Sequence, residues 1–262
     1  MTAHPTLVTT VADGVARVTW SPDLAARGWQ AAVDVVRREV ASALVDHGRV
    51  EAKVPVDDTE GHRIATWSGL RREGVQRDPD GDLVVYARLV DDVPVHEPGG
   101  FRALLNSFLP RKRAISQMLV RDHESRVLLC RLTYKQDWDL PGGVVEVGES
   151  PQVAVSREVS EELGLTIPAG RLLLTDWLPP WGGWDDALCL VFDGGVHDAA
   201  ITGEIVRETR EIRAAEFCTL DEARERCADF TARRLEAAIT LAHEGAGPAY
   251  TESGQQADPS QT

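Results

Sequence analysis

Acidic residues crowd the segment 142–165, GGVVEVGESPQVAVSREVSEELGL, in which Arg157 is the single basic residue. The acidic residues whose types and spacing could do chemistry are Glu149, Glu158, Glu161 and Glu162. Like charges at positions i and i+4 of a helix destabilise it by about 0.2–0.5 kcal/mol per pair. The crowding therefore raises the question of what neutralises these carboxylates.

Residues 150–163 are expected to form a helix. Ser150 can cap its N-terminus, Pro151 suits the first helical position, and Gly164 can end the helix in a left-handed conformation. Because the helix has 3.6 residues per turn, apolar residues at every fourth position lie on one face and form a buried stripe. That stripe consists of Val155, Val159 and Leu163.

On this helix Glu158, Glu161 and Glu162 share one face. Glu161 and Glu162 lie in the last turn, where the helix dipole prefers cations, at a cost of about 0.3–1 kcal/mol each. A solvated acidic face is the usual alternative. A hard divalent cation would reverse both costs, and carboxylate oxygens suit Mg²⁺ or Mn²⁺. Gly143 can bring its carbonyl to the same ion, so the residues predict metal-assisted attack on a phosphate compound.

The full pattern G-x5-E-x7-R-E-U-x-E-E-x-G-U, with U a bulky aliphatic residue, runs from Gly143 to Leu165. On this pattern the chain resembles the Nudix hydrolase family, over about 111–228. The resemblance implies an α/β/α sandwich with a mixed sheet. It also implies hydrolysis of a diphosphate linkage in a nucleoside diphosphate derivative or related compound, assisted by Mg²⁺ or Mn²⁺.

The resemblance further implies roles for individual residues. Arg157 would orient a glutamate, and Glu149 would support the loop or a metal. The metal ligands would be Gly143, Glu158, Glu161 and Glu162. The general base stays open between two of these ligands, Glu158 and Glu162, and an acid of a later loop. The later candidates, for each of which a plain surface role is the alternative, are Glu204, Glu208, Glu211 and Glu216.

Substrate choice is expected outside this pattern. The segment 176–188, DWLPPWGGWDDAL, carries paired prolines and tryptophans before a predicted strand. Trp181 or Trp184 could stack on a base or another ring, and ordinary packing at the rim of the domain is an equal alternative.

The surrounding runs predict the elements that position these residues. Strands are expected at 114–122, 126–132, 171–178, 186–194 and 211–220, and further helices at about 221–227 and at 229–245. The segment 93–113 mixes proline, glycine and a basic run, and is interpreted as an inter-domain connection. We expect an N-terminal domain at 1–108, a Nudix domain at 109–245 and a disordered tail at 246–262.

The N-terminal part alternates strand, helix, strand, helix, strand, with the helices at 28–48 and 59–69 and the later strands at 49–56 and 82–90, which favours an α/β layer. More weakly, it resembles the C-terminal half of the GCN5-related (GNAT) N-acetyltransferases. Gly28 and Trp29 match the loop that holds the acyl-CoA pyrophosphate in that family, whereas Ala25 and Gln30 depart from it. We therefore predict a partial, non-catalytic GNAT-like domain, with packing, homodimer formation and ligand sensing as open roles.

Composition narrows the partners. A net charge of −14 disfavours a nucleic-acid polymer as ligand. No apolar run approaches the roughly 20 residues that span a bilayer, and the first ten residues lack the features of a secretory signal. The four cysteines are scattered, which favours reduced thiols in a cytoplasmic setting.

We expect a hydrolase of phosphoanhydride bonds with a small-molecule diphosphate as substrate. The alternative is a regulatory protein that uses Nudix and GNAT-like folds to bind a nucleotide or a CoA derivative. The intact set of glutamates and arginine favours catalysis. A working acetyltransferase is disfavoured, because the N-terminal part is too short for the whole fold.

Overall fold

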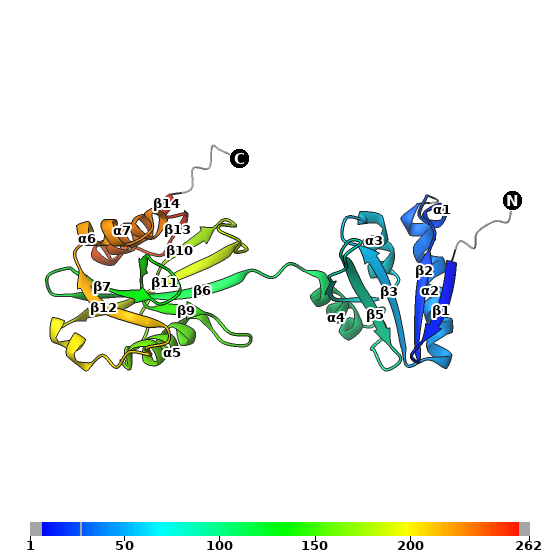
Figure 1. Ribbon diagram of the computed structural model, residues 1–262, viewed down its shortest axis with the longest axis horizontal. Helices are drawn as coiled ribbons and strands as arrows, with labels where there is room; N and C mark the ends of the chain where they lie inside the picture. Colours follow the sequence, from blue (N-terminus) through cyan, green and yellow to red (C-terminus); the bar gives the residue numbers. More distant parts are fainter. Residues whose placement is uncertain (1–6, 27, 257–262) are drawn as a thin grey trace. The chain divides into compact units, whose positions relative to one another are not determined.

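The computed structural model describes residues 7–26 and 28–256 (Figure 1). The chain divides into two compact units between Pro110 and Arg111. The expected connection at 93–113 is only partly irregular, because helix α4 (Pro98–Phe108) occupies its centre. Pro98 lies at the start of that helix, where the fixed φ of proline is favourable and its missing N–H costs nothing.

The N-terminal unit is an α/β layer. In the described residues its strands form one sheet in the order β1-β2-β3-β5-β4, in which β2 and β3 are parallel and the other neighbours are antiparallel. The elements are β1 (Leu7–Ala12), β2 (Val15–Trp20), α1 (Pro22–Ala25), α2 (Trp29–Asp46), β3 (Arg49–Pro55), α3 (Thr59–Trp67), β4 (Arg71–Gln76), β5 (Leu83–Leu89) and α4.

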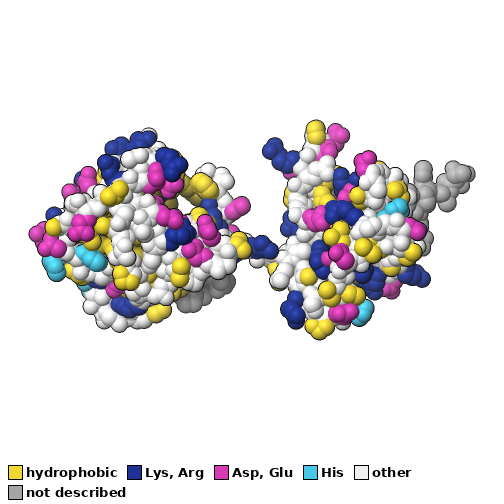
Figure 2. Space-filling model, turned by 90° about the horizontal axis from the view of Figure 1, so that it is seen from below, with side chains coloured by type: hydrophobic (Ala, Val, Ile, Leu, Met, Phe, Trp, Pro, Cys, Tyr) yellow, Lys and Arg dark blue, Asp and Glu magenta, His cyan; other side chains and the backbone are white. Residues whose placement is uncertain are grey.

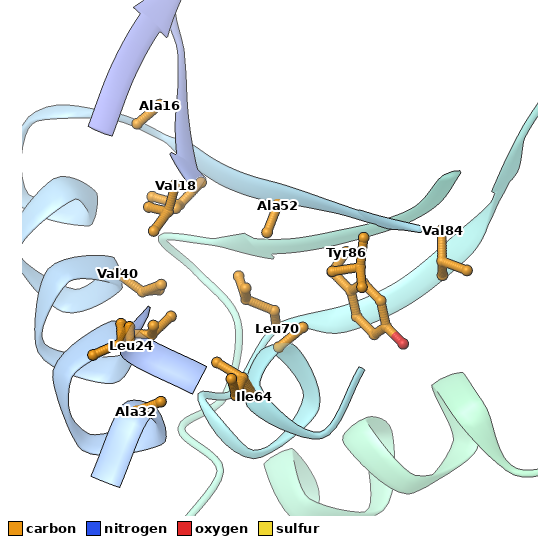
Figure 3. Packing of buried hydrophobic residues seen from close by; sticks show 14 residues of the cluster. Ala16, Val18, Leu24, Ala32, Val40, Ala52, Ile64, Leu70, Val84 and Tyr86 are labelled. Carbon is orange, nitrogen blue, oxygen red and sulfur yellow. The ribbon is translucent and has the colours of Figure 1, made fainter. Parts of the chain in front are cut away.

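The core of this unit lies between the sheet and helices α2 and α3 (Figure 3). Ala32, Val36 and Val40 recur at every fourth residue of α2 and are fully buried. One strand is expected before α2, and the structure has two, β1 and β2, which pair as a hairpin. Its turn, Asp13-Gly14, has positive φ at both residues, which is the geometry that joins two strands tightly.

The C-terminal unit contains nine described strands in one mixed sheet. The main order is β12-β7-β6-β11-β10-β13-β14, with parallel pairs at β6–β11 and β10–β13. The strands are β6 (Arg113–Asp122), β7 (Val127–Leu132), β8 (Trp138–Asp139), β9 (Gly142–Val144), β10 (Leu172–Leu178), β11 (Ala187–His197), β12 (Ile212–Cys218), β13 (Ala249–Glu252) and β14 (Gln255–Gln256). The helices are α5 (Pro151–Leu163), the short 3₁₀ helix η1 (Ala199–Glu204), α6 (Leu220–Arg226) and α7 (Asp229–Glu244).

Helix α5 covers one face of this sheet, and α6 and α7 cover the other (Figure 1). Alternate residues of β6 serve the two sides, since Met118 and Val120 pack toward α5 while Leu119 packs toward α7. The expected α/β/α sandwich with a mixed sheet is therefore confirmed.

The expected disordered tail at 246–262 is wrong for residues 249–256. Strand β13 pairs in parallel with β10, and β14 folds back on β13. The buried carboxylate of Asp176 fixes this segment, because it accepts hydrogen bonds from the Thr251 hydroxyl at 2.7 Å and the Gly254 N–H at 2.8 Å. Residues 257–262 lie outside the described residues.

Acidic and basic side chains are interspersed over the visible surface of both units (Figure 2). In the part of the chain that the structure describes, no helix combines the length and the apolar character needed to cross a membrane.

Candidate active site

Helix α5 forms where its sequence predicts it. The Ser150 hydroxyl accepts a hydrogen bond from the Val153 N–H at 3.3 Å, and Pro151 is the first helical residue. Gly164 ends the helix with φ +68°, a left-handed conformation that glycine adopts without strain. The Ser116 hydroxyl of β6 donates to the Pro151 carbonyl at 2.6 Å, which attaches the start of the helix to the sheet.

Arg157 is the centre of the acidic cluster. Its Nε and Nη2 donate to the two carboxylate oxygens of Glu149 at 2.9 and 3.0 Å. Its Nη1 lies 2.9 Å from Glu161 Oε2 and 3.1 Å from Glu158 Oε1. The hydrogen bonds from Arg157 lower the pKa of Glu149, and those to Glu149 are the main cause that raises the pKa of Arg157. One guanidinium thus joins three of the four predicted glutamates.

Glu162 is the most buried of these carboxylates, with 5% of the residue exposed. The Gly142 N–H donates to its Oε2 at 3.0 Å. Burial raises the pKa of Glu162 to about 8, and the nearby charges of Glu158 and Glu211 act in the same direction, whereas the Gly142 hydrogen bond opposes them. This carboxylate lies where a negative charge lacks compensation.

Glu158 lies against the backbone of Gly143. A Cβ atom at Gly143 would come within 2.6 Å of the Glu158 carboxyl carbon, so glycine is needed for this approach. The Glu158 side chain is 15% exposed. Burial raises its pKa, and the charge of Arg157 opposes that effect. Glu158 and Glu162 therefore both face the Gly142-Gly143 backbone that precedes the helix.

Glu161 differs from its neighbours, because its side chain is 60% exposed and pairs with Arg157. Among residues 7–26 and 28–256, no three acidic, histidine or cysteine side chains already form a ligand set for a metal ion. The donors that are present nevertheless suit a hard divalent cation. They are carboxylate oxygens and a backbone carbonyl, and two of the carboxylates have pKa values raised by burial.

The four later acidic residues differ in whether they lie near the carboxylates of α5. Glu211 lies close enough that its charge raises the pKa of both Glu158 and Glu162. By contrast, Glu208 is held by Arg210 at 2.9 Å, and Glu216 is held by Arg226 at 2.9 Å. Glu204 is exposed at the end of η1. Sequence spacing could not select Glu211, because the turn that carries it reaches the helix only through the fold.

Trp181 and Trp184 enclose the two-residue turn Gly182-Gly183. Both glycines have positive φ, and the two tryptophans exchange backbone hydrogen bonds at 2.9 and 3.1 Å. The indole rings are largely exposed, at 65% and 60% for the whole residues. The Arg113 guanidinium lies 4.9 Å from the centre of the Trp184 ring, and both tryptophans line a small pocket of about 120 Å³.

The register of β6 relates this pocket to the glutamates. Arg113 pairs with Ala187 of β11, directly after the tryptophan turn. On the other side of β6, the Val145 N–H donates to the Ala114 carbonyl at 3.0 Å. The tryptophan pocket and the loop before α5 therefore lie at the same end of β6.

A chain of buried polar groups also escaped sequence reasoning. Gln117 donates to Asp139 at 2.8 Å and accepts from Arg234 at 2.8 Å, and Arg234 in turn donates to Asp176 at 2.8 Å. Lys135 lies 2.7 Å from Asp139, whose charge contributes to the raised pKa of Glu162. These residues come from separate strands, a loop and α7, so the spacing within any one segment could not predict the network.

Comparison with known proteins locates the same region. The family model described as NUDIX domain matches residues 110–238. A MutT-like protein of Streptomyces ambofaciens is 33% identical over 135 residues, which is 52% of this chain and 79% of that protein. The nucleoside triphosphatase NudI of Escherichia coli is 31% identical over 115 residues, or 40% of this chain and 77% of that protein.

A solved structure of a MutT protein from Methanosarcina mazei Go1 is 23% identical, with a TM-score of 0.43. The matched region is 53% of this chain and 99% of the Methanosarcina mazei chain. The resemblance of the N-terminal unit to GNAT acetyltransferases lies outside residues 110–238 and stays a prediction.

Proposed function

The chain belongs to the Nudix hydrolase family, and on this premise we propose that its C-terminal unit cleaves the diphosphate linkage of a nucleoside diphosphate derivative with Mg²⁺ or Mn²⁺. The observation that carries the proposal is the position of the partly buried Glu158 and the buried Glu162, whose carboxylates face the Gly142-Gly143 backbone. The likeness to a nucleoside triphosphatase supports a nucleotide derivative as substrate.

The proposed ligands of the cation are the carboxylates of Glu158, Glu161 and Glu162 with the carbonyl of Gly143. A bound Mg²⁺ would polarise the phosphoryl oxygens and acidify a water molecule. To join the other three ligands, Glu161 would exchange its surface ion pair with Arg157 for the cation. Surface ion pairs are worth only about 0–1 kcal/mol, so this exchange costs little.

Arg157 and Glu149 are proposed to position the ligands. The two-point contact between them ties α5 to the loop before it, and the same guanidinium lies 3.1 Å from Glu158. A planar guanidinium bound at two points holds its partner in one orientation. This arrangement would keep Glu158 directed toward Gly143.

We propose Glu211 as the acceptor of the proton from the attacking water. A carboxylate that holds a cation is a weak base, which disfavours Glu158 and Glu162 for this step. Glu211 lies off the helix, yet its charge reaches both of these carboxylates. Glu211→Gln would then lower kcat without loss of cation binding. Glu158→Gln or Glu162→Gln would abolish cation binding and lower kcat as well.

Trp181 and Trp184 are proposed to receive the base or another ring of the substrate. Both line the pocket beside Arg113, at the same end of β6 as the loop that precedes α5. Exposed indole rings offer flat apolar surface for stacking. Trp184→Ala is expected to raise KM more than it lowers kcat.

A hydrolysis screen over nucleoside diphosphate derivatives, with Mg²⁺, Mn²⁺ or a chelator, tests the function; chromatography detects the nucleoside monophosphate product. The wild type should hydrolyse at least one of them with metal present, and Glu161→Gln and Glu162→Gln should be impaired. Glu225→Gln, at an exposed position of α6, is the matched control. If no derivative is hydrolysed, or if the two active-site variants equal the wild type, the proposal is lost.

A further inference from the structure

The N-terminal unit has a pocket of its own, with a volume of about 390 Å³. It lies among helix α3, strands β4 and β5 and the end of α4. Pockets that hold small organic ligands commonly enclose about 300–1,000 Å³. The pocket is therefore large enough for a ring compound of nucleotide size or smaller.

Two arginine side chains line this pocket, and no acidic side chain lines it with them. The guanidinium groups belong to Arg63 and Arg72, and no aspartate or glutamate is among the lining residues. Within residues 7–26 and 28–256 neither arginine forms an ion pair, although arginines nearby, such as Arg49 and Arg71, do. In a chain with a net charge of −14, two unpaired guanidinium groups at one pocket favour an anionic ligand.

The floor of the pocket carries a fixed polar pair. His62 Nε2 lies 3.1 Å from the Val56 carbonyl, which can only accept, so Nε2 carries the proton of the neutral ring. His62 Nδ1 then accepts from the Tyr86 hydroxyl at 3.0 Å. The Tyr86 ring is buried at the edge of the core, with its hydroxyl directed away from Ile64 and Leu70 (Figure 3). The side chain of Thr66, another lining residue, also hydrogen-bonds to this hydroxyl.

The walls are apolar and partly aromatic. Trp67 and Phe108 face the pocket together with Val84. The Arg72 N–H donates to the Ser107 hydroxyl at 3.1 Å, which ties the last turn of α4, and with it Phe108, to strand β4. Aromatic walls bind flat rings through apolar burial and stacking.

We propose that this pocket binds a planar organic anion, a flat ring that carries a carboxylate or a phosphate group, with Arg63 and Arg72 as its anion-binding residues. Two sources share this chemistry. One is an aromatic acid, and the other is a nucleoside monophosphate, the class of product that hydrolysis of a nucleoside diphosphate derivative releases.

Calorimetric titration of the full chain in a chelating buffer tests the proposal. The probes are adenosine monophosphate, 4-hydroxybenzoate and, as a neutral ring, adenosine. We expect one of the two anions to bind with Kd below about 1 mM and adenosine to bind at least tenfold more weakly. Preference for the monophosphate or for the aromatic acid identifies the source.

Charge removal at the pocket separates it from the active site. The double variant Arg63→Gln/Arg72→Gln should weaken binding of the anion at least tenfold. Arg77→Gln, at an exposed arginine directly after β4, should leave it unchanged. Both arginines are exposed, so the variants should keep the circular dichroism spectrum of the wild type.

Two outcomes would overturn the proposal. One is that neither anion binds below about 1 mM. The other is that the double variant binds as the wild type does while Trp184→Ala does not, because that would place the anion in the C-terminal unit. Hydrolysis is not measured, so this result does not depend on the proposed enzymatic function.

Discussion

Arg157 and Glu149 are joined by two hydrogen bonds, from Nε to Oε1 at 2.9 Å and from Nη2 to Oε2 at 3.0 Å. Glu149 belongs to the loop before α5 and Arg157 to the middle of that helix, so this pair closes the loop onto the helix. Only the planar fork of arginine can make both bonds while a third nitrogen lies near Glu158.

Arg157→Lys should therefore be costly although it keeps the charge. A lysine replaces the two-point contact with a single donor, so Glu158 loses its fixed direction, and we expect kcat to fall about 10–100-fold. Steady-state kinetics on the best substrate of the screen measure this. Arg224→Lys, in an exposed ion pair of α6, is the control and should be neutral. Equal kcat for both variants would refute the positioning role.

Gly143→Ala should inactivate the enzyme for steric reasons. The added Cβ would lie 2.6 Å from the Glu158 carboxylate carbon, so the carboxylate must move. We expect kcat/KM to fall on the order of 100-fold, with little change in melting temperature. Gly203→Ala is the matched control, because a Cβ there meets no atom within 4 Å. A Gly143→Ala enzyme that is as active as the control would show that Glu158 need not lie against this backbone.

Stability without metal should depend on pH through Glu162. Its pKa is about 8 in the folded protein against 4.5 for the unconstrained group, so the folded state binds the proton more tightly. This contribution is complete below about pH 4.5 and is lost as pH rises toward 8. Relative to Glu162→Gln, the wild type should lose on the order of 1–3 kcal/mol of unfolding free energy between pH 5 and 8.

Urea denaturation of both proteins in a chelating buffer measures this difference at each pH. Mg²⁺ should reduce it, because a cation stabilises the ionised carboxylate. A difference that stays constant from pH 5 to 8 would mean that Glu162 is not held in an unfavourable site.

The sequence predicted α5 closely because its signals are local. Ser150, Pro151 and Gly164 each act within one turn of a helix end. The alternation of residues that predicts the neighbouring strands is also local to each strand. The family resemblance added the sandwich that surrounds them. The features that the sequence did not predict depend on contacts between distant segments. Examples are the effect of the Glu211 charge on Glu162 and the hydrogen bond from Thr251 of β13 to Asp176.

Glu161 has two sets of neighbours at helical spacing. It shares a face with Glu158 and Glu162, and it also follows Arg157 by four residues, the spacing that predicts the surface ion pair that the structure shows. Spacing determines where a Cβ points but leaves the end of a flexible side chain to its partners. The prediction of a disordered tail at 246–262 was wrong in part for a related reason. Its polar composition gives no sign that β13 pairs with the distant strand β10.

Asp176→Asn should destabilise the C-terminal unit strongly. The substitution leaves the Arg234 guanidinium, which is 2% exposed, without its buried counter-charge. Breaking such a pair costs about 3–5 kcal/mol. Thermal or urea denaturation measures the loss, and Asp221→Asn, in an exposed pair, is the control with an expected cost of about 0–1 kcal/mol. Similar losses in the two variants would contradict the buried network.

The most direct test of a cation site on α5 is a Mn²⁺ titration followed by electron paramagnetic resonance, with hydrolysis measured on the same samples. The wild type should bind Mn²⁺ and hydrolyse the substrate, whereas Glu158→Gln and Glu162→Gln should lose both together. Glu225→Gln should retain both. Wild-type Mn²⁺ binding and turnover in the Glu158→Gln and Glu162→Gln proteins would contradict the site.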